Sequence, residues 1–331
     1  MGQLAERRRQ EEAGEPALIP SSFHNATSGS GTSAAAIRTL LMKFVSLAAL
    51  GSIALSAAFV TPVSTATAAE NTPCGKITLA EMNWPSAQVI TRVSKFFIEQ
   101  GYGCTVQVVP SATVTATKSL AEVGEPDIVP ELWLNGALAL NKLLDEGTVV
   151  ELNRVLSDGG IEGWYVPNYI VEKHPEITTI AGLKANPEVV GGVFNQCPEG
   201  WACRVSSQSL IEALEIKEAG FKIFSHGSGE TLATSIASAF EEKKPWFGYY
   251  WSPTPVLGKY PMTRIDIGPV DLDVHNCNAD ATCERVGISQ FPPSPVATIA
   301  TKSFVAREPE VAELMRKVAF TNAQMNEVLA W

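Results

Sequence analysis

The chain has few of the residues and none of the motifs that enzymes of this size commonly use for catalysis. Only 4 of its 331 residues are histidine. We find no P-loop, no G-x-G-x-x-G after a strand and no H-E-x-x-H, and therefore expect no cofactor. The stretch SHGSGE around Ser228 is not a nucleophile elbow, because His226 replaces the first glycine of G-x-S-x-G. A secreted hydrolase that uses His226 or Ser228 remains the weaker alternative to a protein without enzymatic activity.

Basic residues are also scarce. The chain carries 25 Lys and Arg against 35 Asp and Glu, which gives a formal net charge of −10. A negative surface repels nucleic-acid phosphates and anionic lipid headgroups. We therefore expect neither as a partner, whereas a cationic ligand would not be repelled.

Long hydrophobic runs are missing except near the N-terminus. In residues 42–69 a lysine precedes an apolar run that Ser, Thr and Pro interrupt, and small residues follow. This is the layout of a cleavable secretory signal peptide rather than of a membrane span. Residues 1–41 are polar, and we interpret them as an upstream start-site misassignment, with a disordered extension as the alternative. Since no cysteine follows the small residues, we expect a soluble exported protein without a lipid anchor.

All cysteines lie after the expected cleavage site, at Cys74, Cys104, Cys197, Cys203, Cys277 and Cys283. An even number in an exported chain indicates disulfides, although the sequence allows fifteen pairings. The two Cys-x5-Cys pairs suggest local bridges 197–203 and 277–283, which leaves Cys74 with Cys104. A four-cysteine zinc site is the alternative, but zinc ligands usually lie closer together, and we expect no metal.

Short apolar runs alternate with amphipathic stretches in the rest of the chain. We predict strands at 76–82, 105–110, 127–132, 190–194, 221–227, 246–251 and 296–303, and helices at 86–102, 206–220, 229–245 and 308–331. This alternation predicts an α/β protein with mainly parallel sheets. We expect one lobe at 75–165, a second at 166–269, and a tail, 270–331, that returns to the first. The last helix ends without a C-cap signal, so we expect a missing C-terminal segment.

Aromatic residues gather where predicted strands give way to loops. They are Trp84 in EMNWPS, Trp133 in PELWLNG, Trp201 in EGWACR and Trp251 in YYWSPT, with Trp164 and Tyr165 in the polar stretch EGWYVPN. Because ligands of open α/β sheets bind beyond the carboxyl ends of strands, aromatics there would line a cleft. For each one alone, burial as a packing anchor is the favoured interpretation, and it is their recurrence that favours a cage.

Clustered aromatic faces suit two classes of ligand. Sugars stack on them, and quaternary ammonium ions, which have no N–H donor, are attracted by the ring quadrupoles. Sugar sites also need many Asp, Asn and Arg side chains, and these loops offer few. A quaternary ammonium compound is therefore the favoured ligand, and another small zwitterion or a sugar is the alternative.

From about residue 77 to 331 the chain resembles the substrate-binding proteins of glycine betaine/choline ABC importers. DIVPELW (127–133), CPEGWACR (197–204) and YYWSP (249–253) carry the resemblance, and EMNWPS and GWYVP support it more weakly. It implies a monomeric periplasmic receptor with a type II, two-lobed periplasmic-binding-protein fold, which holds its ligand in the interlobe cleft and delivers it to the permease subunits of an ABC transporter.

The resemblance to the betaine-binding branch also implies roles for individual residues. Trp133, Trp201 and Trp251 would form the aromatic cage. The backbone N–H groups of Ala202 and Cys203 would hold the ligand carboxylate, in a loop closed by the disulfide between Cys197 and Cys203. That bridge would hold a ring face and two donors in place before binding.

Two departures from the family pattern bear on the ligand. Betaine binders often have a histidine four residues after the ELW tryptophan that donates a hydrogen bond to the ligand carboxylate, and this chain has Ala137 there. Asn135 or Ser86 would have to substitute. In the choline branch the cage uses an early tryptophan, here Trp84, and an aromatic near GWYVP, here Trp164 or Tyr165. That branch's aspartate after the early tryptophan is replaced by Pro85-Ser86, so we expect glycine betaine to bind at least about tenfold tighter than choline, with proline betaine or choline as alternatives.

Overall fold

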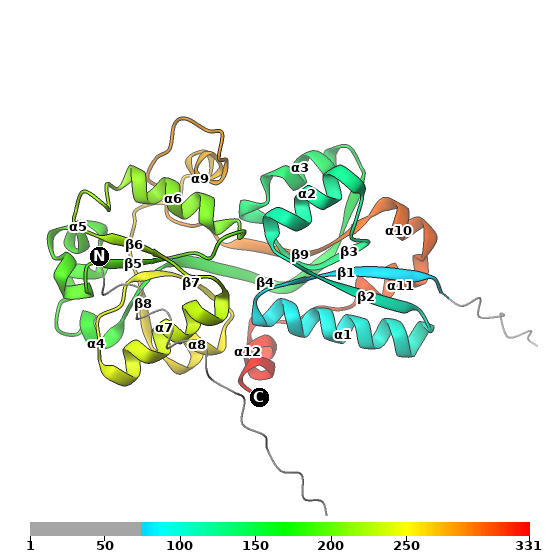
Figure 1. Cartoon of the computed structure of the whole chain (residues 1–331), viewed down its shortest axis with the longest axis horizontal. Coiled ribbons are helices and arrows are strands. Elements are labelled where there is room, and N and C mark those ends of the chain that lie inside the picture. The colour runs from blue at the N-terminus through cyan, green and yellow to red at the C-terminus, as the bar shows by residue number, and fades with distance from the viewer. Residues whose placement is uncertain (1–73) are drawn as a thin grey trace, which may run out of the picture. The chain divides into compact units, whose positions relative to one another are not determined.

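The structure, a computed structural model, describes residues 74–331; the predictions made for residues 1–69 lie outside this range (Figure 1). The strands are β1 (Lys76–Met82), β2 (Thr105–Ser111), β3 (Ile128–Trp133), β4 (Val149–Pro167), β5 (Val193–Gln196), β6 (Lys222–Ser225), β7 (Gly248–Ser252), β8 (Met262–Arg264) and β9 (Ser294–Thr301). No helix in the described range is long and apolar enough to cross a membrane.

The α-helices are α1 (Pro85–Tyr102), α2 (Thr113–Val123), α3 (Leu138–Asp145), α4 (Asn168–Val171), α5 (Ile180–Ala185), α6 (Cys203–Ala213), α7 (Gly229–Glu242), α8 (Pro255–Lys259), α9 (Leu272–Ala279), α10 (Lys302–Arg307), α11 (Pro309–Met315) and α12 (Asn322–Ala330). Short 3-10 helices are η2 (Leu134–Gly136), η3 (Pro175–Thr178) and η4 (Pro187–Val190). Figure 1 shows helices on both sides of the strands, with α1 opposite α2 and α6 opposite α7.

The strands pair in the order β2-β1-β3-β9-β4-β7-β5-β6, and β8 also pairs with β4. β1 is parallel to β2 and β3, and β5 is parallel to β6 and β7. The prediction of mainly parallel sheets is wrong for the centre of this order. There β9 runs antiparallel to β3 and β4, and β4 runs antiparallel to β7 and β8.

β4 connects two groups of strands. Its residues 149–160 pair with β9, and its residues 161–167 pair with β7 and β8. The first strand group therefore comprises β2, β1, β3, β9 and the start of β4, and the second comprises the end of β4 with β7, β5, β6 and β8. The lobe boundary predicted at 165/166 falls inside β4, a strand that the sequence analysis did not predict.

Most predicted elements are present, with ends that local backbone geometry explains. α1 has Pro85 in its first turn and ends at Gly103, which has a left-handed φ of 69°. β5 begins only at Val193, because Gly191 and Gly192 both have positive φ angles. Three of the strands end within two residues of the predicted strand-end aromatics: β1 ends at Met82, two residues before Trp84, β3 ends at Trp133, and β7 ends at Ser252, one residue after Trp251.

The single helix predicted at 308–331 is wrong. The chain forms α11 and α12, and residues 316–321 between them do not continue the helix. Phe320 pairs through its backbone with β4, donating to the carbonyl of Val155 and accepting from Ser157 N. Thr321 then caps α12 in a capping box with Gln324.

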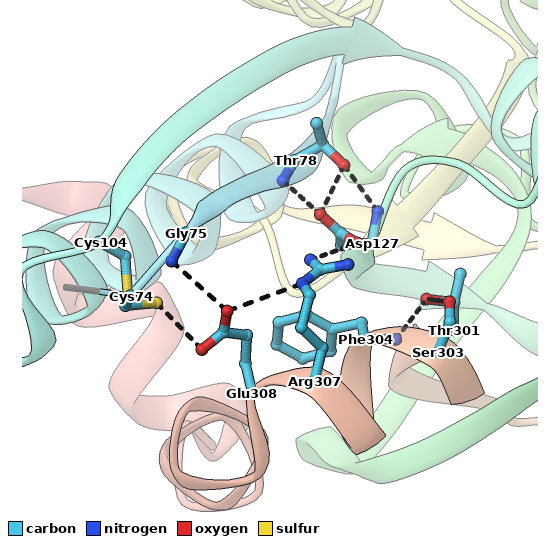
Figure 2. A network of polar contacts seen from close by, with 10 residues as sticks. All are labelled: Cys74, Gly75, Thr78, Cys104, Asp127, Thr301, Ser303, Phe304, Arg307 and Glu308. Atoms are coloured by element: carbon cyan, nitrogen blue, oxygen red, sulfur yellow. Dashed lines mark hydrogen bonds and ion pairs between the residues drawn. A yellow bond between two sulfur atoms is a disulfide. The ribbon is translucent and has the colours of Figure 1, made fainter. Parts of the chain in front are cut away.

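The C-terminal helices lie against the first strand group. Asp127, just before β3, accepts from the backbone N and Oγ1 of Thr78 on β1 and forms an ion pair with Arg307 at 2.9 Å. Glu308 accepts from the backbone N of Gly75, beside the Cys74–Cys104 disulfide (Figure 2). These contacts join the C-terminal helices to the starts of β1 and β3.

All three disulfide pairings predicted from spacing are confirmed: Cys74–Cys104, Cys197–Cys203 and Cys277–Cys283. Since each of these sulfur atoms is bonded to another, the alternative of a four-cysteine zinc site is wrong. Cys197 and Cys203 are both buried, and they bracket the loop that contains Trp201.

Candidate functional site

One cavity brings together most of the aromatic residues singled out in the sequence. Its volume is about 460 Å³, including its open mouth. The lining residues come from both strand groups and the helices that follow them: Trp84, Thr113, Trp133, Asn135, Gly136, Glu162, Trp201, Ala202, Cys203, Ser206, Tyr249, Trp251 and His275. Four of them are tryptophans that we predicted from the sequence to face a cleft.

The rings meet one another at steep angles. Trp201 lies edge-on to Trp84, with ring centroids 5.1 Å apart, and edge-on to Trp251, with centroids 5.0 Å apart. Tyr249 is nearly parallel to Trp251 at 6.3 Å. Faces that point in several directions around one cavity are the arrangement that attracts a compact cation.

A buried carboxylate holds two of the rings. Oε1 of Glu131, on β3, accepts from Nε1 of Trp84 at 2.6 Å and from Nε1 of Trp133 at 2.9 Å. Ser86 Oγ donates to the same oxygen at 2.9 Å. Burial raises the pKa of Glu131, and the hydrogen bonds from Trp133, Trp84 and Ser86 oppose that rise. Glu131 therefore fixes the orientation of both indoles from behind the cavity.

Trp133 also depends on a glycine in the strand opposite. A Cβ atom built on Gly160 of β4 would overlap Cζ3 and Cη2 of the Trp133 ring. The absence of a side chain at this position lets the indole lie against the β4 backbone.

The Cys197–Cys203 loop is held by contacts to three other segments. Trp201 Nε1 donates to Asn83 Oδ1 at 2.6 Å, and the backbone N of Val114 donates to the carbonyl of Gly200 at 3.1 Å. Gly200 has a φ of 81°, which favours glycine. On η2, a side chain at Gly136 would overlap Cβ of Ala202.

The loop also presents free hydrogen-bond donors at the start of a helix. α6 begins at Cys203, after Ala202, and no described residue accepts from the backbone N–H of either. Both residues line the cavity. N–H groups in the first turn of a helix favour an anion.

Trp164 and Tyr165, also named as candidates from the sequence, do not line this cavity. Trp164 is fully buried, packs against Phe194 and Phe247, and donates through Nε1 to Ser207 Oγ at 3.1 Å. Its surroundings are those of a packing anchor.

The substitutes considered for the missing histidine are already engaged. Ser86 Oγ donates to Glu131, and Asn135 Nδ2 donates to the carbonyls of Pro292 and Pro293. Instead, His275 of α9 lines the cavity from a part of the chain that carried no motif. It is buried, its Nε2 has no partner among the described residues, and burial lowers its pKa.

Sequence reasoning also missed Glu162 and Tyr249. Glu162 directly precedes the GWYVP motif on β4, and its Oε1 accepts from the Tyr249 hydroxyl at 2.8 Å. Burial raises its pKa to about 7, although the hydrogen bond from Tyr249 and the charge of Arg264 oppose the rise. The signal available in the sequence was an acidic residue directly before an aromatic motif.

The residues of the hydrolase alternative have other partners. The Nε2 atom of His226 is 2.9 Å from Asn195 Oδ1, and Ser228 caps α7 by accepting from the backbone N of Thr231. No hydrogen bond joins His226 to Ser228 in the described chain, so the pair does not form a nucleophile with its base.

Comparison with known proteins identifies the family of the chain. Residues 75–331 match the family model described as the substrate binding domain of ABC-type glycine betaine transport systems. No curated protein matches the chain significantly.

Solved structures share the fold. The glycine betaine/L-proline-binding protein ProX of Borrelia burgdorferi is 16% identical, with a TM-score of 0.61 over 77% of this chain and 85% of that one. A choline-binding protein in complex with choline is 16% identical, with a TM-score of 0.61 over 77% and 82%. Lactococcal OpuAC with glycine betaine is 20% identical, with a TM-score of 0.58 over 77% and 88%.

The predicted α/β fold class, that of two-lobed type II periplasmic binding proteins, is thus confirmed. Members of the matched family bind substrates for transport and are not enzymes. The chain belongs to the family of substrate-binding domains of ABC-type glycine betaine transport systems.

Proposed function

We propose that this protein is the periplasmic receptor of an ABC importer and that it binds glycine betaine in the aromatic cavity. The observation that carries the proposal is the convergence of Trp84, Trp133, Trp201 and Trp251 on one cavity that also contains unused backbone donors. A trimethylammonium group has no N–H to donate, so the attraction of aromatic ring faces must compensate the cost of its desolvation.

The two ends of glycine betaine match two parts of the cavity. The ammonium group would lie among the rings, and the carboxylate would accept from the N–H groups of Ala202 and Cys203 at the start of α6. His275 offers a further polar group, which would compensate for the histidine that Ala137 replaces in this chain. The ligand would then be released to the permease subunits of the transporter.

Calorimetric titration with glycine betaine tests the proposal. We expect one site with saturable binding, and a loss of affinity when Trp251 is replaced by Phe. Trp246→Phe is the matched control, because Trp246 is equally buried but donates to Ser235 away from the cavity. No binding of glycine betaine by the folded wild type, or an equal loss in both variants, contradicts the proposal.

Choline is the second candidate ligand, because Glu162 places a carboxylate in the cavity. The sequence favours glycine betaine over choline, since no acidic residue directly follows Trp84. A hydroxyl acceptor is nevertheless present, on another strand.

A further inference from the structure

Glu162 is the only acidic residue among those that line the cavity within residues 74–331. It is 8% exposed, and its Oε1 accepts from Tyr249 at 2.8 Å. No described residue donates to its other carboxylate oxygen. Such an oxygen in a cage of rings is a direct partner for a cation or for a hydroxyl donor.

The charged and titratable groups around Glu162 do not neutralise it. Arg264 on β8 acts on it electrostatically, but its Nη2 donates to the carbonyl of Phe291 and it forms no ion pair with Glu162 in the described chain. The other titratable groups nearby are Tyr165 on β4 and Tyr249 on β7, which interact electrostatically with Glu162, and His275 on α9, which lines the cavity. Tyr250 on β7 and Glu131 on β3 do not line it.

The tyrosines and His275 do not change charge between about pH 6.5 and 8, whereas burial raises the pKa of Glu131 as it raises that of Glu162. The three tyrosines have raised pKa values and stay neutral there. Burial lowers the pKa of His275, so this histidine is neutral as well. Glu131 lies behind Trp84 and Trp133, and its Oε1 already accepts three hydrogen bonds.

We propose that Glu162 determines which quaternary ammonium compounds the protein accepts: its ionised form admits cations without a carboxylate, such as choline, and its protonated form restricts the site to zwitterions such as glycine betaine. This inference rests on the proposed function. A choline hydroxyl would donate to the ionised carboxylate, and the ammonium group would gain a counter-charge. For glycine betaine the ionised carboxylate attracts one end and repels the other, so the net effect is small.

The pKa of Glu162, about 7, places this change near neutral pH. If choline binds only the ionised form, its apparent affinity scales with the ionised fraction, which rises about tenfold from pH 6 to pH 8. Choline binding at pH 7 then releases about half a proton per site.

The test titrates choline and glycine betaine calorimetrically into the whole protein at pH 6 and pH 8, in buffers with different ionisation enthalpies. We expect the choline affinity to rise by five- to tenfold with proton release, and the glycine betaine affinity to change less than twofold. Glu162→Gln should abolish both the rise and the proton release and should weaken choline more than glycine betaine. The matched control is Glu218→Gln, since Glu218 is exposed and has no ion pair in the described chain.

Each failure has its own signature. The inference is overturned if glycine betaine binds but the choline affinity does not change with pH, or changes equally in Glu162→Gln. Either result leaves the proposed function standing. A pH effect that disappears in His275→Gln but persists in Glu162→Gln also overturns the inference. Failure of the folded wild type to bind either ligand overturns the proposed function together with the inference.

Discussion

Trp201 donates its indole N–H to Oδ1 of Asn83 at 2.6 Å, although 118 residues separate the two in the chain. The bond joins the disulfide-closed loop to the segment between β1 and α1, which carries Trp84. It thereby fixes the angle between the Trp201 and Trp84 rings, whose centroids lie 5.1 Å apart.

Asn83→Ala should therefore weaken ligand binding without unfolding the protein. We expect a loss of about 1 kcal/mol of binding free energy, because the indole of Trp201 must be ordered when the ligand binds. Titration with glycine betaine measures this loss, and thermal unfolding serves as the control. Unchanged affinity would show that the ring is held without this bond.

The Cys197–Cys203 bridge is expected to act on binding more than on folding, because the loop it closes is short. Replacing both cysteines by serine should cost about 1–2 kcal/mol of binding free energy, from ordering the loop. The Cys277–Cys283 bridge is a matched control, since it has the same sequence separation of 6 and neither cysteine lines the cavity. Equal effects on affinity from the two bridges would contradict this role.

Gly160→Ala should displace Trp133, because the new Cβ would overlap the indole ring. We expect at least about a tenfold loss of affinity, comparable to losing one ring face from a desolvated cation. Gly101→Ala is the control, since a Cβ at Gly101 in α1 meets no atom within 4 Å. Binding at wild-type affinity by Gly160→Ala would mean that Trp133 does not contact the ligand.

The stability of the unliganded protein should depend on pH through Glu162. Burial raises the pKa of this carboxyl to about 7 from 4.5, so the folded protein keeps a proton that the unfolded chain releases. The stabilising contribution is complete below about pH 4.5 and is lost as the pH rises to 7, at no more than about 1.4 kcal/mol per pH unit.

Glu162→Gln removes this dependence. The difference in free energy of unfolding, variant minus wild type, should increase from pH 5 to pH 7, as measured by urea denaturation. A difference between the two proteins that stays constant with pH would show that Glu162 does not carry the proton in the folded state.

The sequence predicted the parts of this fold that depend on local patterns. The strand at 76–82 and the helix that follows it were predicted from apolar periodicity, and the disulfides were predicted from spacing. β4 was missed because Asp158, Gly159 and Gly160 resemble a turn. The strand continues through them, since it pairs with β9 up to Gly160 and with β7 from Ile161 on.

The candidate site was predicted only in part, because some of its residues are brought together by the tertiary fold and not by a local pattern. Tryptophans at strand ends are visible in the sequence, so Trp84, Trp133, Trp201 and Trp251 were named. Glu162 and His275 reach the same cavity from β4 and α9, and only the tertiary fold brings them there. Trp164 follows a glycine, as Trp201 does, but its neighbours in space are Phe194 and Phe247.

The central claim is that the cavity recognises a quaternary ammonium charge through aromatic faces. Its most direct test compares glycine betaine with 3,3-dimethylbutyrate, in which a carbon atom replaces the nitrogen and the shape is nearly unchanged. At pH 6, where Glu162 is mostly protonated, cation–π attraction should make glycine betaine bind at least about tenfold tighter. Equal affinities would contradict the account, because the rings would then be responding to shape and apolar area alone.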